Sequence, residues 1–181
     1  PGELSLAHHG ILFLDEFAEF PRHVLEMIRQ PLEEGQVTVS RAKGTLRFPA
    51  RFILIAAMNP CPCGYFSTGM RRCRCTPTQI ERYMAKISGP LMDRMDIHID
   101  VPLVEFRKLR SRQNGDSSEQ IRSRVQQARR IQRQRFGHPF MTNAMMGHKQ
   151  VEKFCELDST SEMLLRQAMA EFALSARAHD K

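Results

Sequence analysis

The sequence predicts an α/β core, a parallel sheet with flanking helices and a β-hairpin insert, followed by an α-helical subdomain. Two wholly apolar runs, 11–14 and 52–57, are typical of strands buried on both faces of a parallel sheet. Strand-like segments end near Pro102, and apolar residues then recur at helical spacing. We therefore expect three parts: a core over 1–103, a linker over 104–117, and a helical subdomain over 118–181 that continues past the last residue.

The composition is that of an ordinary soluble protein with its positive charge concentrated in one stretch. The 181 residues are 41% hydrophobic and 26% charged, with a net charge of +7, and no apolar run approaches the ~18 residues of a membrane span. Five cysteines and no signal-peptide pattern favour a reducing cytoplasm. Residues 107–135 carry ten basic and two acidic side chains, which predicts an anionic partner such as nucleic acid or, alternatively, a solvated helix face.

The first apolar run ends in two carboxylates, Asp15 and Glu16. Ligands of open α/β sheets bind just beyond the carboxyl ends of the strands. Asp15 is therefore a candidate for the shell of a Mg²⁺ ion, and Glu16 for orienting a water molecule. Taken alone, the pair is equally compatible with an acidic turn.

A helix and a β-hairpin are predicted between the two strands. Apolar residues from Val24 to Leu32 share one helical face, Gly35 follows the helix, and Pro31 is expected to kink it. Residues 36–48 then alternate on either side of a glycine-containing tip that carries Arg41 and Lys43. Such a basic tip is either a solvated turn or a finger that grips a phosphate backbone.

The second apolar run also leads to a polar side chain, Asn59. Because parallel strands deliver their carboxyl ends to one edge, we expect Asn59 to lie near Asp15 and Glu16. Two acids and an amide at one point can orient a water molecule against a γ-phosphate. This conjunction is more specific than either strand alone.

Four of the five cysteines, Cys61, Cys63, Cys73 and Cys75, lie in one loop after this strand. They predict a tetrahedral zinc site that pins the loop, although the one-residue spacing within each pair is tighter than usual. Four reduced thiols are the main alternative, and iron–sulfur ligation is a third.

The core is predicted to finish with helices and one more strand. Thr76 to Gln79 form a capping-box pattern at the start of a helix, and residues 97–101 alternate as a strand. Arg94, just before that strand, is a candidate arginine finger for a neighbouring subunit. A surface salt bridge with Asp93 or Asp96 is the alternative.

The helical subdomain is predicted from caps and apolar spacing. Ser117 begins a long helix that ends at 136–137, Ser159 to Glu162 begin another, and Ser175 would cap a further one. The basic residues of the long helix include Arg129 and Arg130, our candidates for contacts with DNA phosphates.

Four segments resemble the magnesium-chelatase-like AAA+ ATPases. They are Gly-Ile-Leu-Phe-Leu-Asp-Glu at 10–16, the hairpin ending at Phe48, Ala-Met-Asn-Pro-Cys-Pro-Cys-Gly at 57–64, and Ser-Gly-Pro-Leu-Met-Asp-Arg-Met-Asp-Ile at 88–97. The four-cysteine loop and Leu-Ser-Ala-Arg-Ala at 174–178 resemble the ComM/YifB branch rather than the chelatase subunits. The similarity spans nearly the whole chain.

The resemblance implies a role for each matching position. Asp15 and Glu16 match Walker B, Asn59 matches sensor 1, Arg94 matches the arginine finger, and Arg177 matches sensor 2, which touches the nucleotide from a lid. The hairpin around Arg41 and Lys43 matches the pre-sensor-1 hairpin that faces a central pore. The family further implies ATP and Mg²⁺ as cofactors and a hexameric ring. Its ComM members are similar to DNA helicases that drive branch migration during uptake of transforming DNA.

One family motif, the Walker A sequence G-x-x-x-x-G-K-[ST], does not occur in these 181 residues. We expect it upstream of Pro1, so that this stretch alone binds ATP poorly and hydrolyses none. The main hypothesis is part of an ATP-driven motor acting on DNA, which the basic segment favours. An alternative is a chelatase-type ATPase that remodels a partner protein or metal-insertion complex, against which the cysteine loop weighs. A third hypothesis is a nucleic-acid-binding module on a degenerate ATPase.

Overall fold

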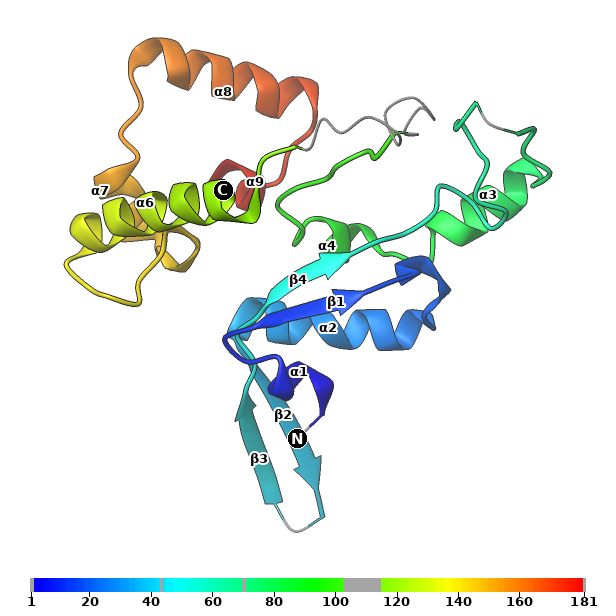
Figure 1. Cartoon of the computed structure of the whole chain (residues 1–181), viewed down its shortest axis with the longest axis horizontal. Coiled ribbons are helices and arrows are strands. Elements are labelled where there is room, and N and C mark those ends of the chain that lie inside the picture. Colours follow the sequence, from blue (N-terminus) through cyan, green and yellow to red (C-terminus); the bar gives the residue numbers. More distant parts are fainter. Residues whose placement is uncertain (1, 43, 70, 103–114, 181) are drawn as a thin grey trace. The chain divides into compact units, whose positions relative to one another are not determined.

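The computed structural model describes residues 2–42, 44–69, 71–102 and 115–180, with the backbone alone at residues 41, 177 and 180. It divides into two compact units, Pro1–Pro102 and Leu103–Lys181, and each is described by itself (Figure 1). Lys43 and the part of the expected linker at 104–114 lie outside the described residues.

Two parallel strands form the centre of the first unit. β1 (Ile11–Leu14) pairs with β4 (Ile53–Ala56) in the register Ile11↔Ile53 through Leu14↔Ala56. The short helix α1 (Glu3–Leu6) precedes β1. The fold is thus mixed α/β with a parallel pair of strands, as the two apolar runs predicted.

Each of these strands buries one face, whereas the sequence predicted burial of both. Leu14, Leu54 and Ala56 pack against the core, and Figure 1 shows α2 (Arg22–Glu34) behind the strand pair. The opposite face stays open, with exposures of 44–59% for the side chains of Ile11, Phe13, Ile53 and Ile55. The prediction of two buried faces was wrong for this structure because the described residues cover only the α2 side.

The core of the first unit joins α2 to the helices that follow the cysteine loop. Leu25 and Ile28 of α2 cluster with Phe17 and Ala18 of the 3₁₀ turn Phe17–Glu19, with Tyr83 of α3 (Pro77–Met84), with Ile87, and with Leu91 of α4 (Gly89–Met92). The expected caps are present, since Thr76 and Gln79 exchange the two hydrogen bonds of a capping box. Ser88 accepts from the Leu91 N–H at the start of α4.

An antiparallel hairpin follows α2, which ends at Gly35 in the left-handed conformation and contains Pro31 as a buried residue. β2 (Gln36–Arg41) pairs with β3 (Gly44–Pro49), and Arg41 stands opposite Gly44 at the tip. The hairpin projects away from the β1–β4 pair in Figure 1. This position leaves the tip outside the core of the first unit.

The strand predicted at 97–101 is not formed. Residues 95–102 carry no regular structure, and Ile97, Ile99 and Val101 are 77–87% exposed. The alternation of apolar and polar residues is intact, but a strand exists only when a neighbouring backbone accepts its hydrogen bonds. Within the described residues of this unit, no strand pairs with this segment.

The second unit is entirely helical in its described residues. Its long helix α6 (Ser118–Phe136) starts at a capping box between Ser117 and Gln120 and ends at the left-handed Gly137, as predicted. It is followed by the 3₁₀ turn Asn143–Met145 and three helices, α7 (His148–Phe154), α8 (Ser159–Glu171) and α9 (Ala176–Asp180). None of the described helices in either unit is both long and apolar enough to cross a bilayer.

Candidate functional site

The carboxyl ends of β1 and β4 meet at one edge of the sheet. The N–H of Ala57 donates to the carbonyl of Leu14, and the N–H of Phe17 donates to the carbonyl of Ala57, each at 2.9 Å. These bonds continue the parallel ladder past the last paired residues. Asp15 and Glu16 on one strand and Asn59 on the other therefore leave the sheet at the same edge, and all three are exposed.

Glu16 has an unusual backbone for a residue with a side chain. Its φ of 50° and ψ of 42° are left-handed, a conformation that costs on the order of 1–3 kcal/mol and persists only where the surroundings impose it. Here the Glu16 N–H donates to Asp15 Oδ1 at 2.8 Å. The Glu16 carbonyl accepts from Glu19 at 2.7 Å. Together with the buried Phe17, these bonds turn the chain sharply at the strand end.

Tyr83 links the acidic edge to the cysteine loop. Burial raises the pKa of this phenol, and the negative charge of Glu19 raises it further. A hydrogen bond from the backbone N–H of Asn59 lowers the pKa, whereas Cys61 and Glu16 again raise it. The Tyr83 hydroxyl therefore lies beside the backbone of Asn59. This role was not predicted from the sequence, because Tyr83 lies on the apolar face of its helix and its spacing indicates only a core residue.

Arg94 lies inside the first unit rather than projecting from it. Its guanidinium donates to the carbonyl of Pro90 and forms an ion pair with Glu33 of α2. The Arg94 side chain is only 13% exposed. Glu33 is more than 60 residues away in sequence, so the sequence offered no signal for this partner. In this structure Arg94 is held by its own chain.

The four cysteine sulfurs of the loop converge. Cys61 is buried, the other three are half-buried, and all four are free thiols. Their Sγ atoms lie within 4.8 Å of one another. Hydrogen bonds from the N–H groups of Arg74 and Tyr65 lower the pKa of Cys63 to about 6, whereas burial and contact with Cys63 raise the pKa of Cys75 to about 12. The short spacing within each pair thus does not prevent the four from meeting.

Candidate contacts for a phosphate backbone are placed on separate elements. Arg41 ends β2 at the hairpin tip, while Lys43 lies outside the described residues. In the second unit, Arg129 and Arg130 are both exposed on α6. Arg177 lies in α9, and its side chain is not described.

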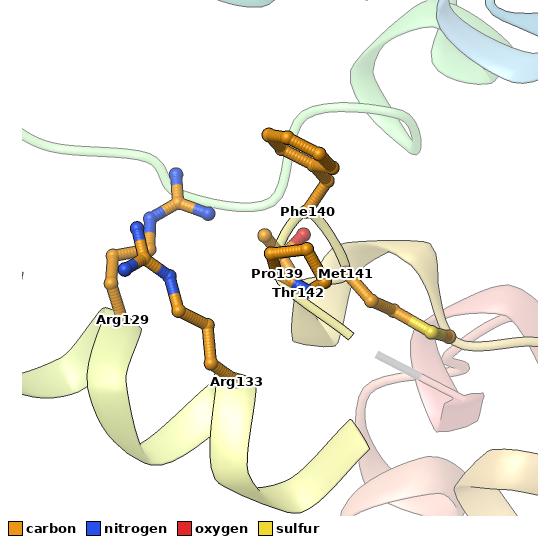
Figure 2. Close-up of a pocket in the computed structure, with 6 residues that line it drawn as sticks. All are labelled: Arg129, Arg133, Pro139, Phe140, Met141 and Thr142. Carbon is orange, nitrogen blue, oxygen red and sulfur yellow. The ribbon is translucent and has the colours of Figure 1, made fainter. Parts of the chain in front are cut away.

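A pocket next to α6 combines two arginines with an aromatic ring, an arrangement that was not predicted from the sequence. Arg129 and Arg133 point toward it from α6, and Phe140 stands at its rim (Figure 2). The pocket holds about 210 Å³ and is completed by Pro139, Met141 and Thr142. Phe140 is 80% exposed, which is unusual for an aromatic ring of this size. An aromatic residue shortly after a basic helix was the available signal.

Comparison with known proteins places the chain in a family. The model of magnesium chelatase, subunit ChlI, matches residues 1–109, and that of its C-terminal part matches residues 115–181. Competence protein ComM of Haemophilus influenzae is 44% identical over all of this chain and 35% of its own length. Protein YifB of Escherichia coli is 41% identical over 98% of this chain and 34% of its own length. The chain belongs to the magnesium-chelatase-like ComM/YifB family. It spans about a third of the length of these relatives.

Similarity to chelatase subunits themselves is more restricted. The magnesium-chelatase 38 kDa subunit of Acidiphilium rubrum is 38% identical over 60 residues, a third of this chain. The ComM/YifB family is of the AAA+ type, for which ATP and Mg²⁺ are the general cofactors. Two carboxylates and an amide, the side chains at the strand edge, are oxygen donors of the kind that Mg²⁺ prefers. The residues at this edge therefore suit the cofactors of the family.

Proposed function

We propose that this ComM/YifB-family chain contributes to the ATP hydrolysis site of a ring-forming motor that acts on DNA. The observation that carries the proposal is the parallel register of β1 and β4, which brings Asp15, Glu16 and Asn59 to one edge. Bound Mg²⁺·ATP would supply the scissile phosphate and neutralise its charge. The chain would supply the groups around it, in a protein that we place in the cytoplasm.

Each residue at the edge has a distinct proposed task. Asp15 would hold the metal shell, and its carboxylate is already oriented by the N–H of Glu16. Glu16 would accept the proton of the attacking water, and Asn59 would position that water. Arg94 would serve a neighbouring subunit after release from Glu33, and Arg177 would touch the nucleotide from the helical unit acting as a lid.

DNA is the proposed substrate on which the motor acts, and branch migration is the proposed task. The relative in Haemophilus influenzae is named a competence protein, and the basic residues of α6 offer charge for phosphates. The pair Arg129 and Arg133 beside the exposed ring of Phe140 also suits single strands, because bases stack on aromatic rings while arginines neutralise phosphates. The hairpin tip with Arg41 and Lys43 would add contacts from the first unit.

Substitution of Glu16 by Gln in the complete protein tests the hydrolysis site. Removing the general base is expected to lower the ATP turnover rate on the order of 10²-fold or more, while binding of ATP persists because the charge of Asp15 remains. Steady-state phosphate release and nucleotide titration measure the two quantities. Glu19→Gln, the same change three residues on, is the matched control and is expected to leave turnover close to normal. Full turnover in Glu16→Gln would refute the assignment.

Addition of DNA to the same assay separates the motor from its main alternative. A DNA motor is expected to hydrolyse ATP faster when single-stranded or branched DNA is present, because engagement of the substrate is coupled to the ATP cycle. An ATP turnover rate that no form of DNA changes would instead support a chelatase-type ATPase that remodels a partner protein. The match to a chelatase subunit favours this alternative.

A further inference from the structure

The sulfur atoms of four cysteines lie together at the centre of the loop between β4 and α3. Its described residues, 57–69 and 71–76, contain neither helix nor strand. The buried hydrophobic side chain among them is Cys61, at 0% exposure. Irregular segments of this length are uncommon in compact domains unless a function or a local contact orders them. In this loop the sulfur cluster takes the place of an apolar core.

Three of the four sulfurs are spaced as in a metal-centred tetrahedron, and the fourth lies within 4.8 Å of them. The Sγ atom of Cys61 is 3.5 Å from that of Cys63 and 3.7 Å from that of Cys73. Cys63 and Cys73 are 3.6 Å apart. Four ligands at the usual Zn–S length of about 2.3 Å stand about 3.8 Å from one another, whereas a disulfide requires about 2.0 Å. The observed spacing thus suits four ligands around one ion rather than two disulfides.

Backbone geometry explains how so tight a spacing can work. Gly64 has a φ of +79°, a left-handed conformation that turns the chain straight after Cys63. Its N–H donates to the Cys61 carbonyl at 2.9 Å. Further along, Ser67 and Gly69 also have positive φ values. These turns bring the second pair of cysteines back to the first.

The surroundings of the sulfurs suit thiolates. The Phe66 N–H donates to Cys61 Sγ at 3.3 Å. Such N–H···S bonds are the outer-shell contacts that orient metal ligands and offset their charge. The loop also carries three arginines, which can balance the net negative charge of four thiolates around a divalent ion: Arg71, Arg72 and Arg74.

We propose that Cys61, Cys63, Cys73 and Cys75 bind one Zn²⁺ ion in a closed tetrahedral site that holds this loop in place. Four protein ligands leave no open position, so the ion is structural and not catalytic. On binding, each S–H gives its proton to solvent and each sulfur forms one bond to zinc. Asn59 lies in the same loop, two residues before Cys61, and a Cβ placed on Gly64 would lie 3.7 Å from Asn59 Oδ1. The ion therefore also restrains the backbone that carries Asn59.

Metal analysis of the complete protein, purified in reductant without chelator, tests the site directly. We expect one zinc per chain in the unsubstituted protein and in Cys155→Ser, which alters the exposed cysteine outside the loop. The double variant Cys73→Ser/Cys75→Ser is expected to lose the zinc. These two positions are half-buried, so the change spares the buried Cys61. Protein free of zinc with the four loop thiols open to a thiol reagent would overturn the proposal, and so would stoichiometric iron.

Hydrogen exchange shows whether the ion holds the loop. Stripping the metal with a chelator is expected to speed exchange at the Gly64 and Phe66 amides while leaving amides of α6 unchanged. Added Zn²⁺ should restore the protection, and added Mg²⁺ should not. Identical exchange with and without zinc would show that the loop needs no ion. Both measurements are made without nucleotide, so their outcome is independent of the proposed ATPase activity.

Discussion

At the residue scale, the acidic pair owes its geometry to local backbone strain. The left-handed Glu16 and the hydrogen bond from its N–H to Asp15 Oδ1 turn the chain at the strand end. A regular strand would alternate them across the sheet. The turn instead leaves both side chains exposed at one edge. Strain kept at such a position is typical of residues that act on a ligand.

The ion pair of Arg94 with Glu33 competes with the proposed role of Arg94 in a neighbouring subunit. The two roles cannot be filled at once by one guanidinium. If Arg94 is an arginine finger, assembly or nucleotide binding must separate it from Glu33. The pair would then act as a resting position for the side chain.

Mixing two inactive variants of the complete protein decides between these roles. Arg94→Ala is expected to reduce ATP turnover about 10³-fold or more, the range for loss of an arginine finger. Mixed with Glu16→Gln, it should regain part of the activity, because some interfaces then pair an intact Glu16 with an intact Arg94. Turnover of the mixture against each variant alone is the measurement.

Glu33→Gln is the matched control for that experiment. It removes the charge of the ion pair but keeps the guanidinium, so turnover should persist. A mixture with no regained activity, together with a loss of turnover in Glu33→Gln, would show that Arg94 only supports the fold of its own chain.

At the element scale, caps determine where the helices begin. The hydroxyl of Ser117 accepts from the Gln120 N–H at 3.2 Å, and the Gln120 side chain accepts from the Ser117 N–H at 2.8 Å. This reciprocal pair satisfies two backbone donors that have no partner within the helix. It lies directly before the basic helix α6, whose own apolar residues Ile121, Val125 and Ile131 are half-exposed. The cap is therefore a sizeable part of what stabilises this helix.

Loss of the cap is expected to weaken the first turn of α6. Ser117→Ala should lower the free energy of unfolding of the helical unit by about 1 kcal/mol, because the backbone N–H of Gln120 loses its side-chain acceptor. Ser118→Ala, the adjacent position inside the helix, is the matched control and should have little effect. Chemical denaturation followed by circular dichroism, with exchange at the Gln120 amide, provides the measurement. Equal effects of the two changes would contradict the capping argument.

At the scale of the whole molecule, charge is concentrated where nucleic acid is proposed to bind. On α6, Arg124 pairs with Asp116 at 2.5 Å, whereas Arg129 and Arg133 face the pocket beside Phe140 (Figure 2). Residues four apart share a helix face. Arg130, one residue after Arg129, is not among the residues that line this pocket. The structure thus distinguishes arginines that the sequence could treat only as one basic stretch.

Removal of the two pocket arginines tests this distinction in the complete protein. Arg129→Ala/Arg133→Ala is expected to weaken binding of single-stranded DNA and to reduce the slope of log K against log salt by about 1.4, at about 0.7 per phosphate contact for single strands. Fluorescence anisotropy at several salt concentrations gives both values. Arg124→Ala removes one charge, which is already paired with Asp116, and should change the slope by less than half as much. An equal change of slope per removed charge in the two proteins would reject the pocket as a DNA contact.

Substitution of Phe140 distinguishes the contribution of base stacking from that of charge in the same binding assay. Phe140→Ala is expected to weaken the binding of single-stranded DNA by about 1–3 kcal/mol, the range for one base stacked on an aromatic ring. The slope of log K against log salt should not change. Duplex DNA should be much less affected, because its bases are not available for stacking. An effect of equal size on both DNA forms would contradict a stacking role.

The sequence by itself determined the elements whose information is local. Capping boxes at Thr76 and Ser117, the glycine that ends α6, and the two apolar strands all follow from side chains within a few residues of one another, and the structure has each of them. The family also followed from contiguous motifs. Local hydrogen bonding and hydrophobic spacing carry this information, so no distant contact was needed.

Only the tertiary structure decided what depends on partners far apart in the chain. The ion pair of Arg94 with Glu33, the place of Tyr83 beside Asn59, and the convergence of four sulfurs in spite of tight spacing all required the folded backbone. The same reason explains the two wrong predictions. A strand at 97–101 and a second buried face on β1 and β4 each need a neighbouring surface, and a residue pattern can prepare a segment for such a contact but cannot supply the partner.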